Sequence, residues 1–384
     1  MQVIPLEQDN VQIVGALDFD RGEQGLTPRR LPAWTRPQVP AFMELMVTQS
    51  AGVRLEFATT SRTIEIDAMI TGLELASRPR ADAVFDLVID DGPDPRSQRF
   101  APGSRVIVDL ARRTEAPERI MGDPTQIRFT DLAAGMKRCA LWLPQNASVE
   151  LRALRLDDDA RLELLPPRSL PRWVHHGSSI SHCAAAHSPT QTWPAVAARV
   201  GGVDGINLGL GGNCHLDQFV ARTMRDEPAD LLSLKVGINI VNADSLKERT
   251  FAPALHGFID TVREGKPETP FLIVSPILCP SAEDHPGPTV LSEDGAFVTI
   301  PGDTEARAGS LTLRRMRTII EQIVADRRGT GDMNLHYLDG LELFGPEDVD
   351  DLPDALHPNG DGYVRMGERF ATLAFGDGAP LAAP

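Results

Sequence analysis

Cysteine is scarce in this chain, and its spacing excludes two classes of protein. The 384 residues include 4 cysteines, none of which forms a Cys-x-x-Cys pair with another. A small secreted disulfide scaffold needs a higher cysteine density, and a cysteine-based zinc site needs closer spacing. We therefore expect the cysteines to be free thiols.

Long apolar runs and excess basic charge are also absent. No segment approaches the roughly 18 apolar residues of a membrane-spanning helix, and the N-terminal "MQVIPLEQDN" lacks the pattern of a secretory signal. The formal net charge of -16 at pH 7 repels nucleic acid and anionic membranes. We expect a soluble, cytoplasmic protein for which small neutral ligands stay open, with neither nucleic acid nor membrane as a partner. Self-association into a homo-oligomer stays open.

The first part of the chain has the pattern of an all-β domain. Short segments rich in β-branched residues alternate apolar and polar positions, and Gly, Pro and Asp separate them. These segments are 62–70, 83–92, 104–111, 126–132 and 139–156. We predict a β-sandwich, jelly-roll-like in type, over residues 1–160.

An acidic segment with several prolines follows the predicted sandwich. Pro166, Pro167 and Pro171 can continue neither a helix nor a strand ladder, so residues 161–171 are predicted to form a linker. Residues 172–384 then alternate strand and helix patterns, which predicts a flavodoxin-like three-layer α/β/α domain with a parallel sheet. Ligands of such domains bind beyond the carboxyl ends of the strands.

Polar residues follow several of the predicted strands at this edge. The sequences are "HHGSSISHC" (175–183), "NLGLGGNC" (207–214), "KVGINI" (235–240) and "DALHPNGDGY" (354–363). We therefore expect one edge of the sheet to carry a serine, a glycine amide, an asparagine and an Asp-His pair.

These residue types match the requirements of acyl transfer. A serine hydroxyl becomes nucleophilic when an imidazole accepts its proton and a third group orients the imidazole. Ser179, His357 and Asp354 are the candidates for these roles. The backbone N–H groups of Ser179 and Gly212 and the carboxamide of Asn239 are candidate donors to the oxyanion.

Taken in order, "HGSSIS", "GLGGN", "VGIN" and "DALHP" resemble the four sequence blocks of the SGNH hydrolases, also called GDSL-type esterases and lipases. The resemblance covers residues 172–375 and implies a serine esterase that needs no cofactor, with Ser179 as nucleophile. Ser178 stands where the family has an aspartate, which puts any role of that acid in doubt. A β-sandwich also precedes the hydrolase domain in bacterial carbohydrate esterases that remove acetyl groups, so the resemblance implies short-chain acyl esters, including esters of carbohydrates.

Other functions stay open at this point. The same residues serve an acyltransferase, which passes the acyl group to an alcohol instead of water. A non-catalytic glycan-binding protein is a second alternative, because serine, glycine and asparagine at these positions also serve as helix caps and turn formers.

The remaining polar residues near the motifs are candidates for substrate contact, and these are Ser178, His182, Asn213 and His215. No metal site is expected, because His175 and His176 point to opposite sides of a strand. Cys183 and Cys214 follow motifs that are expected to be neighbours in space, so a disulfide between them stays open although free thiols are favoured.

A long insertion, residues 279–310, separates a predicted strand from the next helix. Loops of this length in compact domains are usually functional or mobile. Three roles stay open for it: a cover over the acyl pocket, a contact with a partner subunit, or a surface excursion. Trp173 and Trp193 are expected in the core.

Overall fold

The computed structural model describes residues 1–7, 10–75, 81–108, 117–166, 169–300 and 308–382. The chain divides into two compact units: unit 1 is Met1–Ser169 with Ala186–Gln191, and unit 2 is Leu170–Ala185 with Thr192–Pro384. The expected domain limits stay predictions, although the division falls within the expected linker. Residues 186–191, which we expected in the α/β domain, belong instead to unit 1. The expected features at residues 109–111, 167–168 and 301–307 lie outside the described residues.

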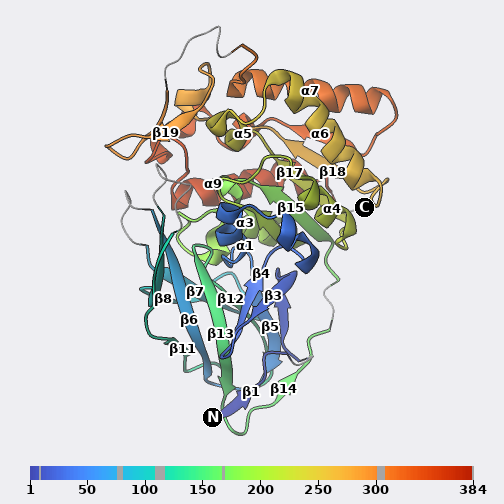
Figure 1. Ribbon diagram of the computed structural model, residues 1–384. Helices are drawn as coiled ribbons and strands as arrows, with labels where there is room; N and C mark the ends of the chain where they lie inside the picture. The colour runs from blue at the N-terminus through green and yellow to red at the C-terminus, as the bar shows by residue number, and fades with distance from the viewer. Residues whose placement is uncertain (8–9, 76–80, 109–116, 167–168, 301–307, 383–384) are drawn as a thin grey trace. The chain divides into compact units, whose positions relative to one another are not determined.

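Unit 1 is a β-rich domain built from two sheets of the described strands (Figure 1). The first sheet has the order β10 (Glu118–Ile120), β9 (Ser104–Val108), β6 (Ile64–Leu75), β13 (Ala147–Leu156), β4 (Leu26–Arg29) and β3 (Asp18–Arg21), with β1 (Gln2–Ile4) on β13 and β11 (Thr125–Phe129) on β6. The second has the order β14 (Leu162–Glu163), β5 (Arg54–Thr59), β12 (Lys137–Trp142), β7 (Ala83–Ile89) and β8 (Arg96–Phe100), with β2 (Gln12–Val14) on β5. The alternating sequence pattern explains this fold, because successive residues of β13 alternate between buried and partly exposed positions.

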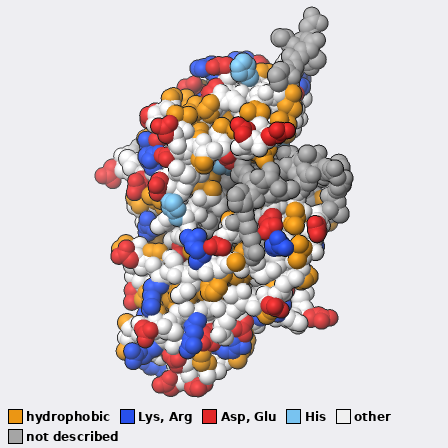
Figure 2. All heavy atoms as spheres, turned by 90° about the vertical axis from the view of Figure 1, so that its left-hand side faces the viewer, with side chains coloured by type: hydrophobic (Ala, Val, Ile, Leu, Met, Phe, Trp, Pro, Cys, Tyr) orange, Lys and Arg blue, Asp and Glu red, His pale blue; other side chains and the backbone are white. Residues whose placement is uncertain are grey.

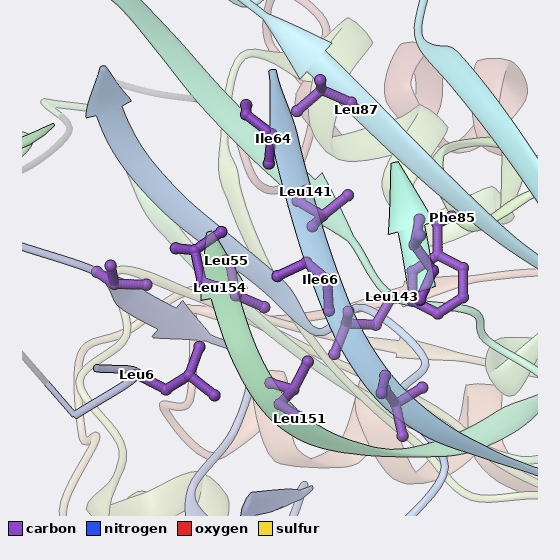
Figure 3. Packing of buried hydrophobic residues seen from close by; sticks show 14 of the residues in the cluster. Leu6, Leu55, Ile64, Ile66, Phe85, Leu87, Leu141, Leu143, Leu151 and Leu154 are labelled. Carbon is purple, nitrogen blue, oxygen red and sulfur yellow. The ribbon is translucent and has the colours of Figure 1, made fainter. Parts of the chain in front are cut away.

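The core of unit 1 lies between side chains of both sheets. Figure 3 shows Leu55 and Leu141 of one sheet beside Ile64, Ile66 and Leu154 of the other, and all of them are fully or almost fully buried. Burying one such side chain contributes about 1.5–3 kcal/mol. The prediction of a β-sandwich is confirmed. The sequence patterns did not reveal the buried strand β5, nor the 3₁₀ helix η1 (Ala33–Gln38) and the helix α1 (Ala41–Val47).

Unit 2 has a parallel sheet with the order β16 (Asp204–Gly209), β15 (Arg172–Gly177), β17 (Leu231–Lys235), β18 (Phe271–Val274) and β21 (Leu335–Leu338). In chain order this arrangement is 2-1-3-4-5, which is the flavodoxin-like order. The prediction for this domain is confirmed. The order reverses between β15 and β17, and ligands of open α/β sheets bind at such a switch point.

Helices cover both faces of this sheet (Figure 1). Trp173 of β15 packs against Trp193 of α3 (Trp193–Gly201) and Phe370 of α9 (Gly360–Phe370), whereas His176 faces the other side and stacks on Phe258 of α6 (Glu248–Arg263). Trp173 and Trp193 are both buried, as expected. The other helical segments are α2 (Ser179–His182), α4 (Gln218–Asp226), α5 (Ile238–Ala243), α7 (Leu313–Gly329), α8 (Gly340–Leu343), the 3₁₀ helices η4 (Pro280–Ala282) and η5 (Pro346–Asp351), and the π-helical turn η6 (Ala371–Phe375); η3 (Pro189–Gln191) is a 3₁₀ helix of unit 1.

The surface of the described residues carries mixed charge. On the face shown in Figure 2, acidic and basic side chains are interspersed with hydrophobic ones. Within the described ranges, no helix combines the length and the apolar character needed to cross a membrane.

Candidate active site

Ser179 is the first residue of α2, directly after β15 and at the switch point of the sheet. The preceding Ser178 has extended backbone dihedrals, and its hydroxyl accepts a hydrogen bond from Ile180 N at 3.3 Å. Ser178 therefore acts as the N-cap of this short helix, and its side chain is buried. The hydroxyl of Ser178 thus stabilises the turn directly before Ser179.

Two glycines at the end of neighbouring strands allow α2 to lie directly on the sheet. A Cβ atom at Gly209 would lie 2.5 Å from the carbonyl carbon of Ser181, and a Cβ atom at Gly177 would lie 2.3 Å from the hydroxyl of Ser181. Real Cβ atoms essentially never come this close to other heavy atoms, so a larger residue at Gly209 would displace the backbone of α2 and one at Gly177 would displace the Ser181 side chain. The nucleophile candidate is therefore placed by the close approach of this helix to the strand ends.

Buried polar side chains of the sheet form hydrogen bonds with α2 and with one another, and we call this group the polar row. His175 Nε2 lies 2.8 Å from the Ser181 hydroxyl and His175 Nδ1 lies 2.7 Å from the Ser233 hydroxyl. The amide of Asn207 donates to the carbonyl oxygen of Ser181 at 2.8 Å, and the Trp173 indole donates to Ser233 at 2.8 Å. The sequence motifs did not reveal this row. Its signal in the sequence is a polar residue at the corresponding position of each of three neighbouring buried strands.

His175 is fully buried in this row. Burial lowers the pKa of its imidazole well below the usual value, and the nearby His176 and Lys235 act in the same direction. The imidazole is therefore neutral at pH 7, and it bridges two hydroxyl groups as a hydrogen-bonding link.

The predicted Ser-His-Asp residues lie together in unit 2. His357 Nε2 is 2.8 Å from Ser179 Oγ, and His357 Nδ1 is 2.8 Å from Asp354 Oδ2. The other oxygen of Asp354 accepts hydrogen bonds from the backbone N–H groups of Leu356 and His357, at 3.0 and 2.6 Å. These bonds fix the carboxylate, and the carboxylate in turn orients the imidazole toward the serine.

Asn239 lies at the start of α5 with its carboxamide in a defined orientation. Its Oδ1 accepts a hydrogen bond from Cys214 N at 3.0 Å, while its Nδ2 has no hydrogen-bond partner among the described residues. The Nδ2 group is thus the one left to donate to a substrate. Gly212 lies exposed on the neighbouring loop, with a φ of 69° that favours glycine.

The residues expected to contact substrate occupy different environments. Ser178 and His182 are buried, and Asn213 is buried with its amide donating to the carbonyl of Gly211. His215 bridges the Ser245 hydroxyl at 2.9 Å and the Gly212 carbonyl at 3.2 Å. The side chain of His215 thus contacts Gly212, a candidate oxyanion donor.

The four cysteines all lie in the described part of the chain, where they are buried and free. Burial raises the pKa of Cys183 and Cys214 above the usual range, so both thiols are protonated at neutral pH. Lys235 is buried near them, and burial lowers the pKa of its amine to about 8. No group of three metal-binding side chains occurs within the described residues.

Known proteins show similarity to both parts of this chain. Residues 172–282 match the model of the GDSL-like lipase/acylhydrolase family. The structure of the salicylyl-acyltransferase SsfX3 from a tetracycline biosynthetic pathway is 28% identical, with a TM-score of 0.79, and the match covers 96% of this chain and 95% of the other.

More distant structures share the fold over a similar length. A GDSL-like lipase from Bacteroides ovatus is 21% identical with a TM-score of 0.68, over 96% of this chain and 95% of the other. An acetyl xylan esterase from the rumen bacterium Butyrivibrio proteoclasticus is 12% identical with a TM-score of 0.53, over 97% of each chain. No curated protein matches the sequence.

Proposed function

We propose that this protein, a GDSL-type SGNH hydrolase acting on carboxylic esters, removes short acyl groups from carbohydrate or other alcohol esters through Ser179, His357 and Asp354. The observation that carries the proposal is the continuous chain of contacts from Asp354 through His357 to the Ser179 hydroxyl, with 2.8 Å at each step. This geometry matches that required of a nucleophile, a base and an orienting carboxylate.

The first half of the proposed reaction forms an acyl-enzyme. Ser179 Oγ attacks the ester carbonyl carbon while His357 Nε2 accepts the hydroxyl proton, and Asp354 stabilises the resulting imidazolium. The carbonyl oxygen becomes an oxyanion, to which Asn239 Nδ2 and the N–H groups of Ser179 and Gly212 donate. His357 then gives the proton to the departing alcohol oxygen, and the carbon–oxygen bond to that alcohol breaks.

Water completes the proposed cycle by the same steps in reverse. His357 accepts a proton from water, the hydroxide adds to the acyl carbon, and the oxyanion is again bound by the same donors. Collapse of this intermediate breaks the bond to Ser179 Oγ, to which His357 returns the proton. The acid is released and the free enzyme is restored.

The proposal is tested by hydrolysis of p-nitrophenyl esters from acetate to palmitate. We expect the highest kcat/KM for the shortest acyl groups and a loss of at least about 10³-fold in Ser179→Ala. Ser178→Ala is the comparison variant: it removes the N-cap of α2 but keeps the proposed nucleophile, so its loss of activity should be much smaller than that of Ser179→Ala. Equal activity of wild type and Ser179→Ala would refute the assignment of the nucleophile, and a strong preference for palmitate would refute the short acyl group.

Acyl transfer to an alcohol is a second candidate function. The 28% identity to a salicylyl-acyltransferase over nearly the whole chain favours it. Both functions share the acyl-enzyme and differ in the acceptor that attacks it. Product analysis with water and an alcohol acceptor in competition distinguishes them, because a transferase forms the new ester in excess of the free acid.

A further inference from the structure

The described part of the 279–310 insertion contains a β-hairpin, in which β19 (Thr289–Leu291) pairs antiparallel with β20 (Phe297–Thr299). Leu291 pairs with Phe297, and Val290 pairs with Val298. Neighbouring residues of a strand point to opposite faces, so Phe297 and Val298 project from different faces of the hairpin. Val298 is exposed, whereas Phe297 is partly buried.

The insertion contacts the turn that carries the proposed acid–base residues. The backbone N–H of Phe297 donates to the carbonyl of Asp354 at 2.9 Å, and the thiol of Cys279 donates to the carbonyl of Ala355 at 3.4 Å. Ala355 has a φ of 61°, a left-handed conformation that costs energy for a residue with a Cβ atom. The insertion thus supports a strained turn at the positions next to His357.

The side chain of Phe297 reaches His357 itself. Their ring centroids are 5.6 Å apart and their planes meet at 68°, which is an edge-to-face contact. Ser179, His357 and Phe297 are each partly exposed, whereas Ile180 and Asp354 beside them are buried. A substrate that reaches the serine and the imidazole therefore also meets the accessible surface of Phe297.

The start of the hairpin lies against the helix that carries Asn239. A Cβ atom at Gly287 would come within 1.7 Å of the carbonyl oxygen of Val241 in α5, so the two backbones are in direct contact. The same insertion therefore contacts the helix of the proposed oxyanion donor near its start and the proposed base through Phe297.

The chemistry of the reaction decides which part of the substrate lies beside Phe297. In the tetrahedral intermediate the oxyanion faces Asn239 and Gly212, and the leaving oxygen faces His357, which must protonate it. The alcohol portion of the ester is thereby placed next to the imidazole, where the Phe297 ring lies. An aromatic ring offers an apolar surface that packs against the apolar face of a ring in the substrate.

We propose that Phe297 is a specificity-determining residue that contacts the alcohol moiety, and that it selects esters of ring-shaped alcohols, such as sugars or aromatic alcohols, over esters of small alkyl alcohols. This inference rests on the proposed function. It places the insertion beside the alcohol portion of the bound ester and beside His357, which protonates the leaving alcohol.

The test compares benzyl acetate, an acetylated methyl xyloside and ethyl acetate as substrates of wild type, Phe297→Ala and Phe297→Leu. All three substrates share the acyl group, so the acyl-enzyme is the same. Because the hydrogen bond to Asp354 comes from the backbone of residue 297, both variants retain it. We expect kcat/KM for the two ring-containing esters to fall at least about 10-fold in Phe297→Ala, and that for ethyl acetate to fall less than about 3-fold.

Val298→Ala is the matched control on the opposite face of the hairpin and should leave all three substrates unaffected. Thermal melting of each variant establishes that it is folded. An equal loss on every ester would mean that Phe297 only supports the turn, and unchanged kinetics would mean that it does not contact substrate; either result overturns the inference. If the proposed function itself is wrong, Ser179→Ala will hydrolyse these acetates as well as the wild type does. This result differs from both results that overturn only the inference about Phe297.

Discussion

Asn239 uses the two ends of its carboxamide for different purposes. The oxygen is held by Cys214 N, which leaves the amide nitrogen available to a developing negative charge. Such a preoriented donor stabilises the transition state more than the ground state, because it requires no reorganisation when charge develops.

We therefore predict that Asn239→Ala lowers kcat by about 10²- to 10³-fold with little change in KM. Steady-state kinetics with p-nitrophenyl acetate measure both constants. Asn242→Ala, one turn further along the same helix, is the control and should keep kcat near the wild-type value. A variant of Asn239 with unchanged kcat would remove this residue from the oxyanion site.

His175 makes a prediction for the pH dependence of stability. The pKa of a histidine in the unfolded chain is about 6.5, and burial lowers it well below this value in the folded protein. Below pH 6.5 the unfolded chain therefore binds a proton that the folded protein does not. The free energy of unfolding falls as the pH is lowered from 6.5, with a contribution from this residue of up to about 1.4 kcal/mol per pH unit.

Denaturant unfolding of wild type and His175→Gln between pH 7 and pH 5 measures this contribution. The variant is expected to show a shallower decline, because glutamine cannot take up the proton. His187→Gln, at an exposed histidine, should keep the wild-type slope. Identical slopes for wild type and His175→Gln would show that the buried imidazole does not control acid stability.

At the scale of the elements, α2 depends on its neighbours in unit 2 for its position. It is too short to be stable by itself, since isolated helices need roughly 12 or more residues. Its position comes from the polar row of Asn207, His175 and Ser233 below it and from the glycines against which it packs.

Gly209→Ala is predicted to displace α2 and thereby the Ser179 hydroxyl. The added methyl group would overlap the backbone of Ser181, so we expect a loss of stability of about 1–3 kcal/mol and a fall in kcat of about 10²-fold. Thermal melting and p-nitrophenyl acetate hydrolysis measure the two effects. Gly205→Ala lies on the same strand, where the nearest heavy atom to the new Cβ would be 3.1 Å away, and serves as a milder comparison. Full activity of Gly209→Ala would contradict this account of how α2 is placed.

Secondary structure could be predicted best where the hydrophobic period was regular. The strand and helix patterns of residues 172–375 correspond to β15 through α9, because parallel strands read as apolar runs and their helices as amphipathic segments. The strand β5 was missed, since all of its residues are buried and "RLEFAT" includes two charged residues, Arg54 and Glu56, which form an ion pair with each other. Arg54 also lies over the ring of Trp142 on the neighbouring strand β12, a contact that only the folded sheet supplies.

At the scale of the whole molecule, a short segment between two parts of unit 2 in the sequence belongs to unit 1. Residues 186–191 belong to unit 1, where the buried carboxylate of Asp86 accepts bonds from the Ser188 hydroxyl at 2.6 Å, from the Thr190 hydroxyl at 2.6 Å and from Thr190 N at 3.2 Å. The Ser97 hydroxyl also donates to Asp86, at 2.6 Å.

Asp86→Ala is predicted to lower the free energy of unfolding by about 3 kcal/mol, because it leaves several buried donors without an acceptor. Chemical denaturation monitored by circular dichroism measures the change. Asp82→Ala, at an exposed position directly before β7, is the control and should change stability by less than about 0.5 kcal/mol. A stable Asp86→Ala protein would show that this carboxylate does not hold the segment in unit 1.

The sequence by itself determined the two fold classes and the residue types of the site. Periodicity is a local property of the chain, and the order of the four motifs is read directly from it, so both were accessible without coordinates. The tertiary structure decided which groups surround these motifs: the polar row beneath α2, the inclusion of residues 186–191 in unit 1 and the contact of Phe297 with His357. These features join residues that are far apart in the chain, and no local pattern records such pairings, because they depend on how strands and loops pack in three dimensions.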